Sequence, residues 1–204
     1  MRIYLVRHGE TDWNLEMRIQ GKTDVPLNTL GITQAEECAM FFRENRFDYV
    51  YSSGLKRAIT TAQIISNGKM PIRTYAELNE RNFGEWETRL WSEVRRNNPC
   101  LKEEWKIMGN KYQPPEGESI LDMTNRVIIK FKEIIGSHCD HDSILIVSHG
   151  GPIKVMVGHA SGLDEYVSYN TLKMDNCSIN IIDYHDNLFN VERTNYVYKQ
   201  FINC

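Results

Sequence analysis

The chain has 204 residues, of which 41% are hydrophobic and 25% charged, and its formal net charge is −3 at pH 7. This length suits a single domain, residues 1–204, that buries roughly 70% of its chain surface on folding, and the weak negative charge argues against nucleic acid as a partner. No apolar run approaches the ~20 residues of a membrane helix, and Ile3 to Val6 is too short for a signal-peptide core, so we expect a cytoplasmic protein without a membrane partner.

Taken in chain order, the segments before residue 76 alternate between strand and helix patterns. They are the strand Arg2 to Val6, the helix Gln34 to Phe42, the strand Phe47 to Ser52, the helix Leu55 to Ile65 and the short edge strand Met70 to Tyr75. The first helix has the capping-box spacing at Thr33 and Glu36. The second carries an apolar residue every three or four positions, as a helix packed on a sheet does.

The middle of the chain, Glu77 to Gly117, is irregular in pattern and holds three of the four tryptophans. We expect it to cover an edge of the sheet. All four tryptophans, Trp13 included, are predicted to pack beneath it, and the alternative is that they line the wall of a pocket. Regular patterns then resume. They are a helix from a capping box at Ser119 and Asp122 through Ile135, the strand Ser143 to Val147, a helix near Pro152 to Ala160, and an antiparallel hairpin of Cys177 to Tyr184 with Asn187 to Thr194 across His185-Asp186.

The order of strands and helices predicts an α/β fold. We expect a three-layer sandwich with a mostly parallel central sheet, helices on both faces and an antiparallel edge. The cysteines are odd in number, scattered and without a C-x-x-C motif, so reduced thiols are expected. They are Cys38, Cys100, Cys139, Cys177 and Cys204.

Two histidines directly follow predicted strands. Arg7-His8-Gly9-Glu10-Thr11 ends the first strand, and Ser148-His149-Gly150-Gly151 ends the strand Ser143 to Val147. In open α/β sheets, ligands bind at the carboxyl ends of the strands. Two imidazoles and an arginine at such an edge indicate a site that handles a phosphoryl group.

The stretch Arg7 to Asn14 resembles the signature of the histidine phosphatase superfamily, which includes the cofactor-dependent phosphoglycerate mutases. The similarity continues, in the family's order, along nearly the whole chain. The further matching stretches are Arg18 to Gly21, Asp24 to Asn28, Ser52 to Ala58, Leu78 to Gly84, Gly117 to Ser119 and Val147 to Gly151. Several motifs in order are far more specific than one short string. The resemblance implies a phosphoglycerate mutase-like fold, with residues 81–118 as a lid-like excursion over the active site.

A phosphate monoester is a dianion, and its hydrolysis needs a nucleophile, positive charge and a proton for the leaving oxygen. Neutral imidazole is a good nucleophile near pH 7, so we assign His8 to attack the phosphorus. One of its ring nitrogens must then donate to a backbone carbonyl. Arg7 and Arg57 supply forked cationic donors, and His149 adds a third if it is protonated beside the phosphate. The remaining predicted phosphate or substrate contacts are Asn14, Gln20, Gly21, Arg81 and the backbone N–H of Gly150.

Glu80 is the predicted general acid and base. It would protonate the leaving alkoxide and then deprotonate the water that attacks phosphohistidine. In the family, the glutamate of an L-x-E motif does this work, and Leu78-Asn79-Glu80 fits that motif. Glu10 lies closer to His8 in sequence, but its position favours a role in the structure of the loop.

Other histidines are predicted to be structural. His138-Cys139-Asp140-His141 resembles a metal cluster, but a solvated turn between helix and strand is the preferred interpretation. His159 and His185 are expected to be hydrogen-bonded residues. We therefore predict no metal and no cofactor.

The family contains phosphatases and mutases that share one site. Mutases grip a substrate carboxylate with an adjacent arginine pair before a proline run, whereas this chain has Trp105 to Asn110 before Pro114-Pro115. Arg95-Arg96 is interpreted as a solvated helix face, although Arg81 has the context to bind a carboxylate. We predict a phosphomonoesterase acting on a small-molecule substrate. The alternatives are a cofactor-dependent phosphoglycerate mutase, an α-ribazole-5'-phosphate phosphatase of cobalamin synthesis, and a binder of phosphorylated ligands without turnover. The sequence leaves a homodimer open.

Overall fold

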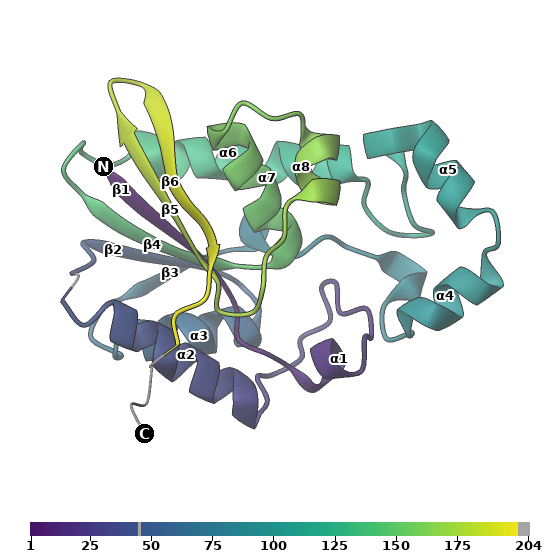
Figure 1. Ribbon diagram of the computed structural model, residues 1–204, viewed down its shortest axis with the longest axis horizontal. Helices are drawn as coiled ribbons and strands as arrows, with labels where there is room; N and C mark the ends of the chain where they lie inside the picture. The colour runs from purple at the N-terminus through teal and green to yellow at the C-terminus, as the bar shows by residue number, and fades with distance from the viewer. Residues whose placement is uncertain (45, 200–204) are drawn as a thin grey trace.

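A computed structural model describes residues 1–44 and 46–199, and a six-stranded sheet forms its centre (Figure 1). The strands are β1 (Arg2–Arg7), β2 (Tyr49–Ser53), β3 (Ile72–Tyr75), β4 (Ser143–Ser148), β5 (Ile179–His185) and β6 (Leu188–Tyr196). Their spatial order is β3-β2-β4-β1-β5-β6. The first four are parallel, whereas β5 and β6 are antiparallel additions at one edge. The predicted α/β class with an antiparallel edge is confirmed.

Helices cover both faces of the sheet (Figure 1). One layer holds α2 (Thr29–Phe41) and α3 (Lys56–Ile65), and the other holds α6 (Ile120–Gly136), α7 (Gly150–Ala160) and α8 (Glu165–Thr171). Alternation along β4 explains the three layers. Ile144 and Ile146 join the apolar cluster under α6 and α7, while Leu145 and Val147 join the cluster under α2 and α3. Because all four are buried, the strand is apolar without a break.

Helix α2 begins before its predicted start. Asn28 caps it by accepting the N–H of Gly31 at 2.8 Å, so the capping box expected at Thr33 is wrong. Leu30 and Ile32 in the first turn are apolar but exposed, so the apolar positions of the sequence do not show the helical periodicity there. The cap at Ser119 is confirmed, since its hydroxyl accepts the N–H of Asp122 at 3.0 Å.

The hairpin of β5 and β6 is confirmed, but its turn lies one residue later than predicted. His185 is the last residue of β5, and Asp186-Asn187 forms the turn. Both turn residues have positive φ, of 51° and 63°. Left-handed backbone at both positions is what a two-residue hairpin turn of the favoured type requires, and Asp and Asn tolerate it well.

The segment expected to be irregular contains helices α4 (Trp91–Asn97) and α5 (Leu101–Met108), which project to one side of the sheet (Figure 1). Three 3₁₀ turns lie in the same region, at Ala76–Leu78, Gly84–Trp86 and Gly109–Lys111. The segment has an apolar cluster of its own, which includes Trp86 and, at its border, Trp91 and Trp105. The predicted packing is therefore confirmed for these three tryptophans, whereas Trp13 lies outside this cluster, against the guanidinium group of Arg18. The predicted lack of regular structure is wrong.

Two further helices, α1 (Asp12–Leu15) and α8, were not predicted. Within residues 1–44 and 46–199, no helix combines the length and apolar character needed to cross a membrane. The cysteines in this part of the chain are unpaired: Cys38, Cys100, Cys139 and Cys177. Cys204 lies outside the described residues.

Candidate active site

Neighbouring strands deliver the two predicted histidines to one place. Strands β1 and β4 pair in parallel with Arg7 opposite Ser148, and the N–H of His8 donates to the Ser148 carbonyl at 3.0 Å. The residue that follows Arg7 at the end of β1 and the residue that follows Ser148 at the end of β4 are both histidines. The centres of the His8 and His149 rings are 5.1 Å apart. Since β1 and β4 are parallel, both histidines lie at the carboxyl edge of the sheet, as the sequence indicated.

His8 is buried and held in one tautomer. Its Nδ1 atom lies 2.7 Å from the carbonyl oxygen of Gly9, so Nδ1 is assigned the proton and Nε2 keeps its lone pair. Burial, followed by the positive charges of Arg57 and Arg7, lowers the pKa of His8 well below its usual 6.5. The ring is therefore neutral at pH 7, the form that a nucleophile requires.

Arg57 connects three parts of the site from the first turn of α3. Its side chain is completely buried, and it donates through Nε to His149 Nδ1 at 3.2 Å. Nη1 donates to the Thr23 carbonyl at 2.8 Å and Nη2 to the Gly21 carbonyl at 2.7 Å. Burial lowers the pKa of Arg57 to about 10, so the guanidinium group stays charged at neutral pH. Gly21 thus serves to orient Arg57.

His149 is a neutral hydrogen-bonding group in this structure. Because Nδ1 accepts from Arg57, the proton is on Nε2, which donates to the hydroxyl of Ser53 at 2.7 Å. Burial and the nearby charge of Arg57 lower the pKa of His149 well below 6.5. Arg7 and Arg57 supply the fixed positive charge, while the role of His149 as a third cation beside a bound phosphate stays a prediction.

Arg7 and Asn14 both have groups that remain available to a ligand. Arg7 donates through Nη1 to the Met174 carbonyl at 2.6 Å, while its buried Nε finds no hydrogen-bond partner among the described residues. Asn14 accepts through Oδ1 from the N–H of Thr11 at 3.1 Å, and its Nδ2 group has no hydrogen-bond partner among residues 1–44 and 46–199. Asn176, which the sequence did not single out, donates to the His8 carbonyl at 3.0 Å.

Glu80 reaches the same edge through two backbone contacts. Its Oε1 accepts the N–H of Arg81 at 2.9 Å, and its Oε2 accepts that of Gly151 at 3.3 Å. A Cβ atom on Gly151 would overlap Oε1, and one on Gly150 would lie 3.8 Å from both Oε2 and Arg7 Nε. The lack of a side chain at Gly151 therefore leaves room for the carboxyl group of Glu80, whereas a Cβ on Gly150 would make only ordinary contacts.

Arg126 on α6 holds the loop that carries Glu80. Its Nη1 donates to the carbonyls of Glu77 and Asn79 at 2.7 and 2.8 Å, and its Nη2 donates to that of Glu80 at 3.0 Å. Glu118 pairs with the same guanidinium group at 2.6 Å through Nε and 2.8 Å through Nη2. No sequence signal marked Arg126, because it is a single arginine within a long helix.

Two predicted contact residues are buried within the protein. Arg81 donates to the carbonyls of Glu118 and Tyr112 at 2.7 and 2.8 Å, and its guanidinium group lies within 6 Å of the rings of Phe83, Trp105 and Tyr169. These contacts hold the segment of residues 81–118 in place. Only Arg81 Nη1, which has no hydrogen-bond partner in the described part of the chain, remains for a ligand. Gln20 is buried as well, and its Oε1 is similarly unpaired there.

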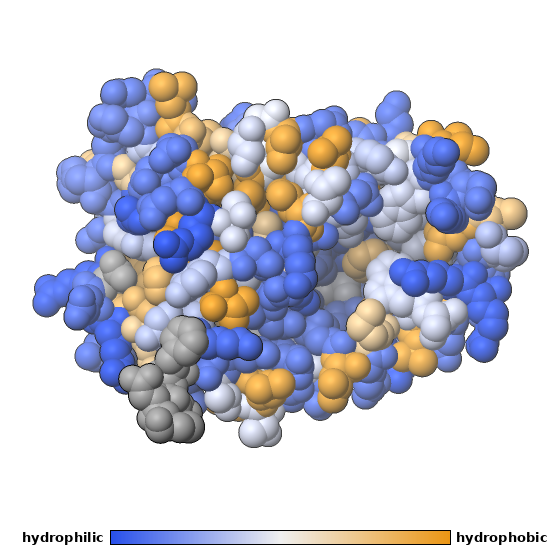
Figure 2. Space-filling view, in the orientation of Figure 1, coloured by the Kyte–Doolittle hydropathy of each residue, from blue (hydrophilic) through white to orange (hydrophobic). Residues whose placement is uncertain are grey.

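A hollow of about 550 Å³ lies beside these groups, lined by Arg7, Gly150 and Gly151 together with residues of α7, α8 and the loop after α8. In the space-filling view, hydrophilic residues surround a depression between the sheet and the α4–α5 region (Figure 2). A larger hollow of about 1050 Å³ between α2 and α3 contains none of the predicted site residues. Of these two hollows, the smaller is the one lined by predicted site residues, Arg7 and Gly150.

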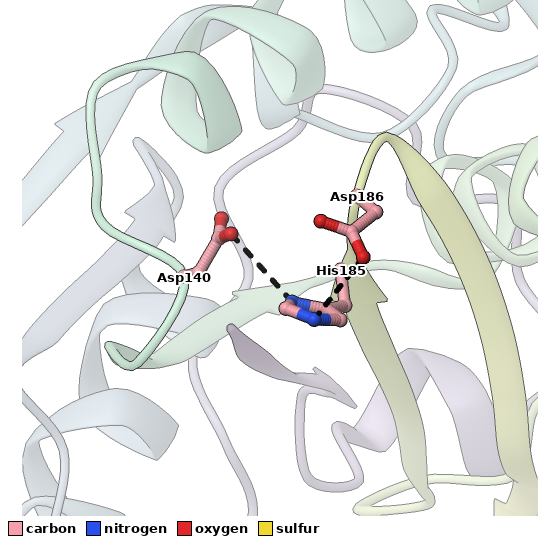
Figure 3. Close-up of side chains that lie close together, drawn as sticks. All are labelled: Asp140, His185 and Asp186. Atoms are coloured by element: carbon pink, nitrogen blue, oxygen red, sulfur yellow. Dashed lines mark ion pairs between the residues drawn. The ribbon is translucent and has the colours of Figure 1, made fainter.

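Within the described residues, one group of side chains has the spacing of metal ligands: Asp140, His185 and Asp186 (Figure 3). Asp140 faces Nδ1 of His185 at 3.6 Å, whereas Asp186 faces Nε2 at 3.3 Å. Each carboxylate faces a different nitrogen of the His185 ring, and one ligand atom from each of the three residues lies within 4.8 Å of the others. All three residues are exposed. His138, from the other suspected cluster, packs against Tyr49, with ring centres 3.9 Å apart.

Acidification is expected to destabilise the folded protein through His8 and His149. Both have a pKa well below 6.5 when folded, so below pH 6.5 the unfolded chain binds protons that the folded chain does not. The contribution of the two histidines to the free energy of unfolding is complete above pH 6.5. Below pH 6.5 this free energy declines, by up to about 1.4 kcal/mol per pH unit for each histidine. Urea unfolding between about pH 7.5 and pH 5, above most carboxyl titrations, measures this slope. A His8→Ala variant should show a shallower slope, and a wild-type stability independent of pH would contradict the prediction.

Comparison with known proteins gives consistent results. The family model described as "Histidine phosphatase superfamily (branch 1)" matches residues 3–197. A probable phosphoglycerate mutase, GpmB, of Proteus mirabilis is 32% identical over 191 residues, which is 91% of this chain and 86% of that protein. The α-ribazole phosphatase of Shigella flexneri has a TM-score of 0.87 at 27% identity, covering 100% of both chains. A phosphoserine phosphatase mutant from Entamoeba histolytica in complex with phosphoserine has a TM-score of 0.85 at 28% identity, covering 96% of this chain and 97% of that one.

Proposed function

Because the chain belongs to the histidine phosphatase superfamily (branch 1), we propose that it is a phosphomonoesterase that hydrolyses a small phosphorylated metabolite through a phosphohistidine at His8. One observation carries the proposal. His8 is neutral, donates through Nδ1 to Gly9 and keeps a lone pair on Nε2 beside the cationic side chains of Arg57 and Arg7. A nucleophile and fixed positive charge thus occur together at one sheet edge.

In the first step, Nε2 of His8 attacks phosphorus, and the bond from phosphorus to the ester oxygen breaks. Glu80 transfers its proton to the departing oxygen, so an alcohol leaves and not an alkoxide. Arg7 and Arg57 match the negative charge of the phosphoryl oxygens, and the N–H of Gly150 and the amide of Asn14 add neutral donors. Each such donor typically stabilises the transition state by about 3 kcal/mol.

In the second step, water attacks the phosphohistidine. Glu80, now ionised, accepts a proton from the water, and the bond from nitrogen to phosphorus breaks. Inorganic phosphate leaves, and both His8 and Glu80 return to their starting protonation states. Residues 81–118, in which α4 and α5 lie, would cover the site as a lid. The contacts of Arg81 with Glu118 and Tyr112 support this role, because they tie both ends of the segment together.

Hydrolysis is preferred over mutase chemistry because the carboxylate-binding arginine pair of the mutases is absent here. Arg95 and Arg96 on α4 are exposed, and Arg81 is bound mainly to backbone carbonyls. The similarity to a probable phosphoglycerate mutase keeps mutase activity as the second candidate. Hydrolysis of α-ribazole-5'-phosphate is a specific form of the first candidate, phosphomonoester hydrolysis. The likeness to the α-ribazole phosphatase of Shigella flexneri supports it.

The test is a panel of phosphoserine, 3-phosphoglycerate, sugar phosphates and nucleoside monophosphates, with isomerisation of 3-phosphoglycerate assayed beside phosphate release. We expect phosphate release from at least one compound and no faster isomerisation. Isomerisation that exceeds release would establish the mutase. Binding of these compounds without any turnover would indicate a ligand-binding member of the family.

A further inference from the structure

The hollow of about 550 Å³ begins where the leaving oxygen would be protonated. Arg7 and Gly150 line it, and so does Gly151, whose N–H donates to Glu80 Oε2. Since Glu80 is the proposed acid for the ester oxygen, the part of the substrate beyond that oxygen faces this hollow. The residues in its walls therefore decide which leaving groups fit.

The charges in these walls are mostly positive. Three cationic side chains line the hollow, from Arg7, Lys154 and Lys173, against one acidic side chain, Asp175. Asp175 is already engaged, because it lies 3.0 Å from Lys173 Nζ and accepts from Asn195 Nδ2 at 3.1 Å. Lys173 is thus neutralised by its neighbour, and Arg7 is assigned to the phosphoryl group.

Lys154 remains without an acidic partner within 4.0 Å among residues 1–44 and 46–199. It projects from α7, is half-buried, and donates through Nζ to the Tyr169 carbonyl at 2.9 Å, with the centre of that ring 5.5 Å away. Burial lowers the pKa of Lys154, and the charge of Glu80 opposes this shift.

We propose that Lys154 binds a carboxylate on the leaving group, so that this protein prefers phosphorylated acids whose carboxylate lies a few bonds from the ester oxygen. The inference rests on the proposed function of the same site and makes Lys154 its specificity-determining residue. A carboxylate supplies the single negative charge that Lys154 needs. A second phosphoryl group would require several free donors, and an uncharged group would gain no attraction between opposite charges from Lys154.

The matched probes are 3-phosphoglycerate and glycerol 3-phosphate, which differ in a carboxylate against a hydroxymethyl group. Calorimetric affinities are measured in the His8→Ala background, where the ligand is not consumed, and kcat/KM is measured in the otherwise unaltered enzyme. We expect 3-phosphoglycerate to be favoured by about tenfold or more in both measurements. Adding Lys154→Met should abolish this preference through weaker binding of the carboxylate compound, whereas Lys154→Arg should restore most of it.

Lys69→Met is the control, since Lys69 lines the larger hollow between α2 and α3, which holds none of the predicted site residues. It should leave the preference within about twofold of the unaltered value. Equal affinity for the two probes, or a preference that survives Lys154→Met, would overturn the inference while leaving hydrolysis intact. A binding preference that depends on Lys154, together with no turnover of either probe or of any other compound in the panel, would uphold the carboxylate site and refute the proposed hydrolysis.

Discussion

Replacing His8 by alanine is expected to reduce phosphate release by about 10⁴-fold or more, because the covalent route disappears with its nucleophile. Affinity for inorganic phosphate should change little, since the guanidinium groups of Arg7 and Arg57 remain in place. Steady-state assays measure the first effect, and calorimetry with inorganic phosphate measures the second.

The control for this variant is His141→Ala, because the His141 side chain is 87% exposed and lies in a surface turn. It should retain full activity and stability. A His8→Ala protein that keeps more than about 1% of the activity would contradict the nucleophile assignment. Loss of phosphate affinity and activity together, in a folded protein, would instead indicate that His8 serves binding.

Replacing Glu80 by glutamine is expected to slow the first turnover of alkyl phosphates by about 10²- to 10⁴-fold. A glutamine side chain has no acidic proton to give, so the alkoxide must leave unprotonated. For p-nitrophenyl phosphate, the nitrophenolate ion leaves readily, and the first turnover should slow by less than about tenfold. A burst of nitrophenolate should then precede a slow steady state. Hydrolysis of the phosphohistidine stays slow, because glutamine cannot accept the proton of the attacking water. Rapid-mixing measurements separate the two phases.

Glutamine also disturbs the two backbone contacts of Glu80, with Arg81 and Gly151. That structural effect would slow all leaving groups alike, so the dependence on the leaving group is the informative result. Glu10→Gln is the matched control, because Glu10 accepts from Asn28 Nδ2 at 3.1 Å and supports the loop. Equal slowing of both ester classes in Glu80→Gln would remove the acid role.

The sequence predicted the central part of the site well because its signals are local. Each of His8 and His149 follows a strongly apolar strand, and the parallel pairing of β1 and β4 brings such strand ends together. Buried parallel strands have unbroken apolar runs, which are easy to detect in a sequence. The antiparallel addition was also predictable, because β5 and β6 are joined by a short polar turn.

The remainder depends on tertiary contacts that leave no pattern in the sequence. Arg126 supports the Glu80 loop through three backbone carbonyls, and any arginine on a helix has the same local appearance. The neutral state of His149 follows from the position of Arg57 Nε, 92 residues away along the chain. Helices α4 and α5 were missed because they are short and mostly exposed, with the break at Pro99 between them.

The most direct measurement is rapid-quench trapping of the phosphorylated enzyme with a phosphorus-labelled monoester, followed by digestion and mass spectrometry in alkaline conditions. The expected result is one labelled peptide, phosphorylated on His8 with the alkali stability of a phosphoramidate, formed within the first turnover. Label on another side chain, or a complete first turnover without any covalent phosphorus, would contradict attack by His8.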